Sequence, residues 1–290
     1  MTASQPDSVA TLLDDAIARL TAAGVPTPDV DAELIIGHVL GERRGRIQAL
    51  AMTDAAVQPE QAASVDELVT RRASREPLQH ITGVAAFRSI ELLVGPGVFV
   101  PRPETELVAQ FAIDALRAAA DGEPIGVDLG TGSGAIALAM ATEVPHASVY
   151  GVENSPEAYA WTTKNLAHVG ADNASLVFAD LTDALPELNG RVAVVISNPP
   201  YVPADAIPRD PEVRLFDPAQ ALYGGADGLD VVRAVSATAQ RLLYPGGTLV
   251  IEHGELQGAA IRQLLAADGW RAPATHPDLT TRDRATTAIR

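Results

Sequence analysis

The chain has 290 residues, of which 47% are hydrophobic and 20% are charged, and its formal net charge is -16. These proportions are typical of a soluble globular protein, and the length suits one large domain or two modest ones. The acidic balance disfavours direct binding of nucleic acid, which needs clustered lysines and arginines. The absence of cysteine excludes disulfides, thiolate zinc sites and a cysteine nucleophile.

The start of the chain and its apolar runs favour a cytoplasmic location. Residues 1–9 are polar and lack the basic and apolar parts of a signal segment. No uninterrupted apolar run approaches the roughly 18 residues of a membrane span. We therefore expect a cytoplasmic protein without membrane contact, and we expect a monomer. The densest basic spots of the first half, at residues 43–46 and at Arg71, Arg72 and Arg75, are interpreted as solvated helix ends.

The first part of the chain, residues 1–76, predicts helices alone. Apolar residues recur at helical spacing after Ser8, a plausible N-cap, until Gly24. A second helix is predicted to begin at Thr27-Pro28, and a third spans residues 58–75. No glycine-rich loop or carboxylate cluster appears in this part. We interpret it as a small helical bundle that recognises a substrate protein.

Residues 77–104 change character and predict a linker. Short apolar runs are interrupted by Gly83, by Gly95-Pro96-Gly97 and by Pro101, which is typical of short strands. We expect a β-hairpin here that joins the helical domain to a second domain of residues 105–290. That second domain is predicted to begin with a helix over residues 105–120.

The second domain alternates between strand and helix patterns. Strands are predicted at 125–129, 148–152, 174–178, 192–196 and 247–251, and helices between them at 135–142, 156–169 and 228–243. Such alternation predicts an α/β fold with a doubly wound, mainly parallel sheet covered by helices. Residues 264–290 are expected to add a final pair of strands.

A glycine-rich loop follows the first strand of this domain. The strand ends in Asp128-Leu129, and the loop is Gly130-Thr131-Gly132-Ser133-Gly134. Alternate glycines let the backbone turn tightly and approach a ligand, and the helix behind them presents free N–H groups. Glu153 ends the next strand, where a carboxylate can bind ribose hydroxyls. Together these features predict a site for a nucleotide-like cofactor.

The details of the loop favour S-adenosylmethionine over a dinucleotide or a nucleoside triphosphate. No Gly-Lys-Ser/Thr is present, and the third glycine comes one residue earlier than in Gly-x-Gly-x-x-Gly. Asp128 would be awkward beside a pyrophosphate but suits a cationic amino acid portion. Asp180, with Leu181 beside it, follows the third strand. It either accepts a hydrogen bond from the adenine amino group or serves as a turn residue, and both alternatives stay open.

The tetrapeptide Asn198-Pro199-Pro200-Tyr201 follows the strand at 192–196. The Asn198 side-chain oxygen and the Pro199 carbonyl can each accept a hydrogen bond, the prolines restrict the backbone, and Tyr201 offers a flat face. This combination suits an –NH2 group on a planar carbon. If this strand lies beside the strand of the glycine loop, both motifs line one pocket at the switch point of the sheet, and Asn198 is then also expected to contact the cofactor.

Taken together, these motifs resemble a class I S-adenosylmethionine-dependent methyltransferase, and further segments resemble the PrmC/HemK family. Those segments are residues 77–83, 100–106, 252–254 and 278–284. The resemblance covers nearly the whole chain. The chain departs from the family pattern at Glu153, where Asp is frequent, at His80, where an aromatic residue is common, and at Thr281, where Gly is frequent.

The resemblance implies methylation of the N5 side-chain nitrogen of a glutamine, in the Gly-Gly-Gln motif of class 1 peptide chain release factors, with S-adenosylhomocysteine as the second product. It leaves open a glutamine in another protein, such as a ribosomal protein. An adenine-N6 methyltransferase of nucleic acid shares the tetrapeptide, and an adenosine-binding module without activity is a further alternative. The sequence does not decide the roles of five residues in or directly beside the family segments: Phe99, Arg102, Glu104, Glu252 and His253. No metal site is predicted.

Overall fold

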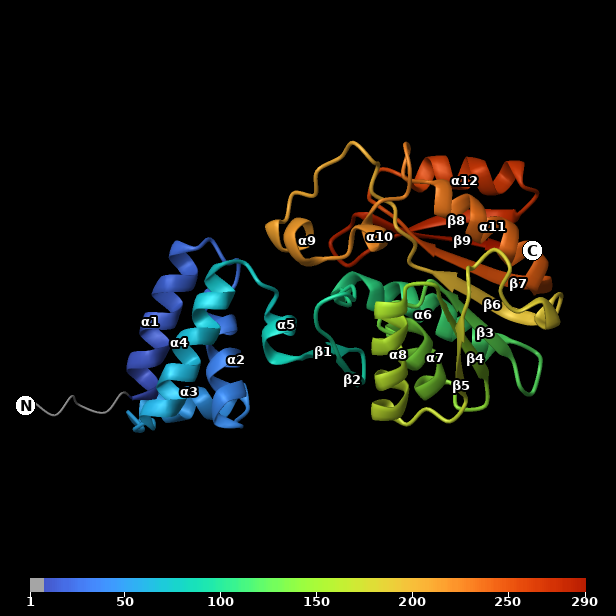
Figure 1. The fold of residues 1–290 in the computed structure, drawn as a ribbon. Helices are drawn as coiled ribbons and strands as arrows, with labels where there is room; N and C mark the ends of the chain where they lie inside the picture. Colours follow the sequence, from blue (N-terminus) through green and yellow to red (C-terminus); the bar gives the residue numbers. More distant parts are fainter. Residues whose placement is uncertain (1–7) are drawn as a thin grey trace, which may run out of the picture. The chain divides into compact units, whose positions relative to one another are not determined.

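The computed structural model describes residues 8–290 and divides the chain into two compact units (Figure 1). One unit contains the described residues up to Gly83 together with Arg209–Phe216, and the other contains Val84–Pro208 and Asp217–Arg290. The expectation that the chain lacks a signal segment depends on residues 1–9. Residues 1–7 lie outside the described part of the chain. Between residues 8 and 290, no helix is long and apolar enough to cross a membrane.

The first unit is entirely helical. Ser8 caps its first helix, as predicted, by accepting a hydrogen bond from the Thr11 backbone N–H at 3.2 Å. The helix at Arg44–Met52 was not predicted from the sequence. It buries only Ile47, so its apolar pattern is too weak to detect. The elements are α1 Val9–Ala22, α2 Pro28–Leu40, α3 Arg44–Met52, α4 Pro59–Ala73 and α5 Leu78–Thr82, joined by α9 Pro211–Phe216 from the later part of the chain.

The basic spot at the end of α4 is not a solvated helix end, and that prediction was wrong. The Arg72 side chain is only 4% exposed. Its Nε donates to Asp31 Oδ2 at 2.7 Å, and its Nη1 lies 2.9 Å from Glu212 Oε1 of α9. Arg75 also pairs with Glu212, at 3.0 Å. Buried arginines need anionic partners, and these partners come from distant segments.

We expect Arg72→Ala to destabilise the helical unit by about 3–5 kcal/mol, because it leaves the buried Asp31 carboxylate without its cation. The matched control is Arg71→Ala, since Arg71 is the neighbouring arginine but pairs with Glu76 at a more exposed position. The control should cost about 1 kcal/mol or less. Hydrogen exchange of the α2 and α4 amides measures both, and equal effects would contradict the burial argument.

The second unit contains the predicted hairpin and a seven-stranded sheet with the order β5-β4-β3-β6-β7-β9-β8. β9 runs antiparallel to β7 and to β8, and the other pairs are parallel. The hairpin consists of β1 Val84–Phe87 and β2 Ile90–Leu93. The sheet strands are β3 Ile125–Leu129, β4 Ser148–Glu153, β5 Ala174–Phe178, β6 Val192–Ser197, β7 Leu243–Glu252, β8 Arg271–Pro277 and β9 Asp283–Ile289.

Helices cover both faces of the sheet, as a doubly wound fold requires (Figure 1). Three of them pack in a core with Val194 and Ile196 on one face, and two pack with Val195 on the other. All six residues of β6 are buried, which explains its continuous apolar run. The helices are α6 Pro103–Ala118, α7 Ala135–Glu143 and α8 Pro156–Val169, then α11 Asp230–Leu242 and α12 Gly258–Ala267, with short turns η1 Pro186–Leu188 and α10 Ala219–Leu222.

Candidate active site

The glycine loop leaves β3 and enters α7 through three residues with left-handed backbones. The φ angles of Gly130, Gly132 and Gly134 are 75°, 59° and 85°, a region that residues with a Cβ rarely adopt. A Cβ at Gly130 or Gly132 would meet nothing within 4 Å, whereas one at Gly134 would meet Thr162 Cγ2 at 2.8 Å. The loop therefore has an open side at its first two glycines, where a ligand fits.

Asp128 lies fully buried beneath this loop. Its Oδ2 accepts hydrogen bonds from Thr131 Oγ1 at 2.6 Å and from the Ala137 backbone N–H at 3.2 Å. Its Oδ1 has no hydrogen-bond partner within residues 8–290. Burial raises the pKa of Asp128 to about 7, and the Glu153 charge adds to this rise. An orphaned carboxylate oxygen fits the positive amino group that the sequence led us to expect in the cofactor.

Asp128 should make stability depend on pH. Its folded pKa lies above its ordinary value of 3.8, so its contribution to the free energy of unfolding is largest below that value and declines as the pH rises toward 7. We expect the wild type to lose about 2–3 kcal/mol relative to Asp128→Asn between about pH 5 and pH 7. Both tryptophans, Trp161 and Trp270, belong to this unit, so denaturation followed by their fluorescence reports on it alone.

The control for that measurement is Asp180→Asn. Its hydrogen bonds from Thr182 lower the pKa of Asp180, so this carboxylate stays ionised throughout the same pH interval in both the folded and the unfolded states. The difference between wild type and Asp180→Asn should therefore be flat. A flat difference for Asp128→Asn as well would contradict the raised pKa of the buried carboxyl.

Glu153 ends β4 and connects it to the glycine loop. Its Oε2 accepts from the Gly132 backbone N–H at 2.8 Å, and its Oε1 accepts from the Asn154 and Ser155 N–H groups at 3.0 and 2.8 Å. The side chain is thus held rigidly at the carboxyl end of the strand. Each oxygen of the Glu153 carboxylate has two lone-pair sites, so the carboxylate can accept a further hydrogen bond beyond these three. That it accepts one from a ribose hydroxyl remains a prediction.

Asp180 follows β5 and forms a turn with Thr182. Its Oδ1 accepts from the Thr182 N–H at 2.9 Å and from its hydroxyl at 2.6 Å, while Asn154 Nδ2 lies 3.4 Å from Oδ2. The turn alternative is therefore present in the structure, and a contact with adenine stays a prediction. Leu181 is half-buried and packs against the core on the α11 side of the sheet.

The structure brings Asn198 to the glycine loop. β6 lies beside β3 in parallel, with Asp128 opposite Ile196. Ser197 Oγ donates to the Leu129 carbonyl at 2.6 Å, which joins the residue before Asn198 to the residue before Gly130. The prediction that the two strands are neighbours is confirmed. Side chains at the carboxyl ends of adjacent parallel strands meet at one edge of the sheet.

Residues that the sequence did not predict hold the tetrapeptide in its turn. Gln257 Nε2 donates to the Tyr201 carbonyl at 2.9 Å. A Cβ at Gly224 would lie 2.3 Å from the Pro200 carbonyl oxygen, and a Cβ at Gly228 would lie 2.3 Å from that of Tyr201. Only glycine permits this backbone contact. The run Gly224-Gly225-Ala226-Asp227-Gly228 was the signal available in the sequence, but it predicts only a loop.

Comparisons with known proteins agree with this arrangement. A family model described as the PrmC N-terminal domain matches residues 11–83, and one described as the methyltransferase small domain matches residues 89–263. A release factor glutamine methyltransferase of Streptomyces coelicolor is 48% identical over 93% of this chain and 94% of its own length. One of Bifidobacterium longum is 44% identical over 94% of this chain and 96% of its own.

The chain belongs to the release factor glutamine methyltransferase family. It has the class I methyltransferase fold, and its cofactor is S-adenosylmethionine. One relative has a different acceptor in its name: a 4-amino-L-phenylalanine/4-methylamino-L-phenylalanine methyltransferase of Streptomyces pristinaespiralis is 38% identical over 100% of this chain and 97% of its own. Among solved structures, a ribosomal protein L11 methylase from Lactobacillus delbrueckii aligns at a TM-score of 0.48 with 19% identity, over 68% of this chain and 83% of its own. So distant a likeness adds nothing to the argument.

The residues of the family segments make internal contacts in this methyltransferase. Arg102 pairs with Asp217 at 2.6 Å and lies 5.0 Å from the centre of the Phe99 ring. This ion pair holds the Arg102 side chain within the protein. His253 is fully buried: its Nδ1 donates to the Gly254 carbonyl at 2.9 Å, so its Nε2 accepts from the Thr286 hydroxyl at 2.9 Å. Both ring nitrogens are engaged in hydrogen bonds within the protein, so neither is available to a substrate.

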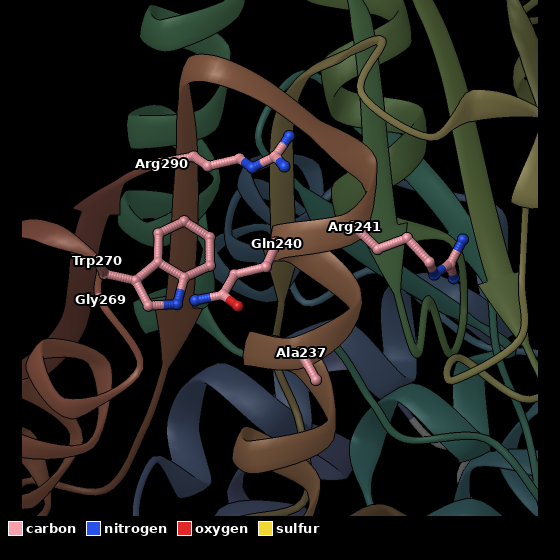
Figure 2. Close-up of a pocket in the computed structure, with 6 residues that line it drawn as sticks. All are labelled: Ala237, Gln240, Arg241, Gly269, Trp270 and Arg290. Atoms are coloured by element: carbon pink, nitrogen blue, oxygen red, sulfur yellow. The ribbon is translucent and has the colours of Figure 1, made fainter.

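A surface hollow of about 500 Å³ lies away from these motifs, at the edge of the sheet where β7 begins (Figure 2). The donors of its two arginines are engaged with the protein: Arg241 donates to the Ala184 carbonyl at 2.7 Å, and Arg290 donates to the Leu243 carbonyl. Because cofactors of doubly wound folds bind at the opposite, carboxyl edge, this hollow is not the methyl-donor site. No group of three or more potential metal ligands occurs within residues 8–290.

Proposed function

We propose that this protein transfers a methyl group from S-adenosylmethionine to the N5 side-chain nitrogen of a glutamine, the one in the Gly-Gly-Gln motif of class 1 peptide chain release factors. One observation carries the proposal: β3 and β6 are neighbours in the sheet. Asn198 and Pro199, which suit a planar –NH2 group, therefore follow a strand that lies beside the strand of the glycine loop, which suits the methyl donor. Relatives named release factor glutamine methyltransferase match along nearly the whole chain.

The cofactor would lie along Gly130 and Gly132, with its amino group toward Asp128 and its ribose toward Glu153. The open side of the loop, the orphaned Asp128 Oδ1 and the rigid Glu153 carboxylate support this placement. When bound, S-adenosylmethionine supplies an electrophilic methyl group. The protein contributes the position of the acceptor nitrogen, which must lie in line with that methyl group at about 3–3.5 Å.

Asn198 and Pro199 make the amide nitrogen reactive. A glutamine nitrogen is a poor nucleophile because its lone pair is shared with the carbonyl group. When Asn198 Oδ1 and the Pro199 carbonyl each accept one of its N–H groups, they orient the nitrogen and stabilise the positive charge that develops on it. Tyr201 packs against the amide plane, and Pro200 stiffens the turn. The proton leaves after methyl transfer, so no general base is needed.

Methyl transfer to purified acceptors tests this function. Labelled S-adenosylmethionine is offered with an unmethylated release factor, a ribosomal protein, DNA, or 4-amino-L-phenylalanine, the acceptor in the name of one relative. We expect label on the release factor alone, and none when its Gly-Gly-Gln glutamine is replaced by asparagine. If DNA or the amino acid were labelled and the release factor were not, the proposed substrate would be wrong and the acceptor would be another planar amine.

The helical unit, which includes most of residues 1–76, is proposed to recognise the substrate protein, with the enzyme acting as a monomer. Deleting this unit would be a poor test, because the deletion also removes Arg72 and Arg75, the partners of Glu212 in a segment that follows Tyr201. Hydrogen exchange of the intact chain is better. Adding release factor should protect amides of α1–α4, and protection confined to the methyltransferase unit would contradict the proposal.

A further inference from the structure

Glu252 is a buried carboxylate that the proposed chemistry does not yet use. It ends β7, the strand beside β6, so it lies at the same edge of the sheet as Asn198. Its residue is only 2% exposed, and its Oε2 has no hydrogen-bond partner within residues 8–290. A buried, incompletely paired carboxylate is costly, and such groups cluster at functional sites.

Thr105 and Asn198 lie beside this carboxylate: Asn198 and Glu252 directly follow Ser197 and Ile251, which pair in the register of β6 with β7. Asn198 Nδ2 lies 3.5 Å from Thr105 Oγ1, and Thr105 is 4% exposed near the start of α6. Burial raises the pKa of Glu252 to about 7, and the neighbouring Thr105 hydroxyl and Asn198 amide act in the opposite direction. The three side chains therefore form a buried group that connects α6, β6 and β7.

The donors and acceptors of this group bear on which end of the Asn198 amide is left for a substrate. A carboxylate can only accept hydrogen bonds, so it attracts the Nδ2 donor. The Oδ1 acceptor is then directed away from Glu252. A protonated Glu252 has an O–H donor, which would favour Oδ1 in place of Nδ2. In that flipped orientation the pocket would receive a donor that cannot bind the N–H of an incoming amide.

We propose that Glu252 and Thr105 are positioning residues for Asn198, and that the ionised Glu252 carboxylate holds the Asn198 amide with its oxygen toward the acceptor nitrogen. The inference rests on the proposed function, since it explains how that clamp is oriented. It also predicts a pH dependence that methyl transfer to an amide does not otherwise require.

Other charged groups act on Glu252 from the neighbouring elements. Arg284 of β9 lowers its pKa, and Glu104 of α6 raises it. Burial raises the pKa of Tyr201, and the Glu252 charge raises it further, which keeps that hydroxyl protonated. Because the pKa of Glu252 is about 7, we expect kcat to fall about tenfold per pH unit below about pH 7.

The test is the pH profile of kcat with the release factor as acceptor. Glu252→Gln should lower kcat about tenfold at high pH and remove the low-pH limb, because a glutamine side chain can present either end but does not ionise. The Kd for S-adenosylhomocysteine should not change. Glu104→Gln is the matched control: the limb should remain but move to lower pH, because one repulsive charge is gone.

A second pair of variants covers the case in which Glu252→Gln does not fold. Thr105→Ser keeps the hydroxyl and should keep kcat, whereas Thr105→Val should lose about tenfold. The inference would be overturned if kcat of Glu252→Gln fell at low pH as it does in the wild type, or if Thr105→Val were as active as Thr105→Ser. Failure of the proposed function has a different signature, because the wild type itself would then leave the release-factor glutamine unlabelled.

Discussion

Replacing Asn198 with alanine is expected to lower kcat by about 100- to 1,000-fold, the usual cost of removing one preorganised hydrogen-bonding group from a transition state. The Kd for S-adenosylhomocysteine should stay within about twofold, because the other groups expected to bind the cofactor lie at or just after the ends of β3, β4 and β5. Asn198 follows the buried strand β6, and its position is set by the neighbouring β3 and by Thr105. Rapid-quench turnover and calorimetric binding measure the two effects separately.

The matched control for this change is Asn189→Ala. Asn189 is an exposed asparagine in the same unit, and its Oδ1 accepts from Arg241 Nη1 at 2.6 Å, at the opposite edge of the sheet. Its loss should leave kcat unchanged. If Asn198→Ala kept kcat within about threefold, the account of the clamp would be wrong. If Asn198→Ala lost cofactor binding as well, Asn198 would have a role in holding the methyl donor.

Gly228→Ala is expected to lower kcat by about 100-fold, although residue 228 has no role in the chemistry. The added Cβ would lie 2.3 Å from the Tyr201 carbonyl oxygen and 2.8 Å from Gln257 Nε2. Such a contact must displace the turn that holds Asn198, and a shift of about 1 Å in a reacting group costs about 100-fold in rate. Steady-state kinetics with saturating cofactor give the value.

Gly170→Ala separates this displacement from simple backbone strain. The φ angle of Gly170 is 70° and that of Gly228 is 74°, but a Cβ at Gly170 would meet nothing within 4 Å. Both variants should lose about 1–2 kcal/mol of stability from the left-handed backbone. Only Gly228→Ala should lose turnover. Equal kinetic losses would show that the effect comes from destabilisation and not from the turn.

The sheet could be predicted from the sequence because its central strands are buried on both faces. The prediction at 125–129 agrees with the central strand β3 residue for residue, and the helix at 156–169 agrees with α8. The prediction at 174–178 also agrees with β5, although β5 is an edge strand with no fully buried residue. Continuous apolar runs that end in glycine or asparagine give a strong local signal. The order of the strands had to be assumed: the strand before Asn198 was taken to lie beside the strand of the glycine loop. The pairing of β3 with β6 confirms this assumption.

Elements that depend on distant partners could not be predicted. α3 buries one residue, and α9 joins the helical unit through ion pairs of Glu212 with Arg72 and Arg75, more than a hundred positions earlier in the chain. The sequence gives no local sign of such pairing, so Arg72 looked like a solvated side chain. Charge patterns identify solvated faces only where no opposite charge folds onto them.

The candidate site was predicted from its motifs, but its supporting contacts were not. The glycine loop and Asn198 have local signatures, whereas the buried group of Thr105 and Glu252 brings together residues far apart in the chain. The sequence suggested that the Asp128 carboxylate is available to the cationic part of the cofactor, but one of its oxygens already accepts a hydrogen bond from Thr131. Which hydrogen bonds a carboxylate makes depends on tertiary packing.

Fragmentation mass spectrometry of the release factor after reaction tests the central claim most directly. The peptide that contains the Gly-Gly-Gln motif should carry one methyl group, on the side-chain nitrogen of its glutamine, and at least about 100-fold less of it should be methylated by Asn198→Ala enzyme at the same early time point. A methyl group on another residue of that peptide, or an unmodified peptide with active wild-type enzyme, would contradict the account that the turn at Asn198 presents a glutamine amide to the methyl donor.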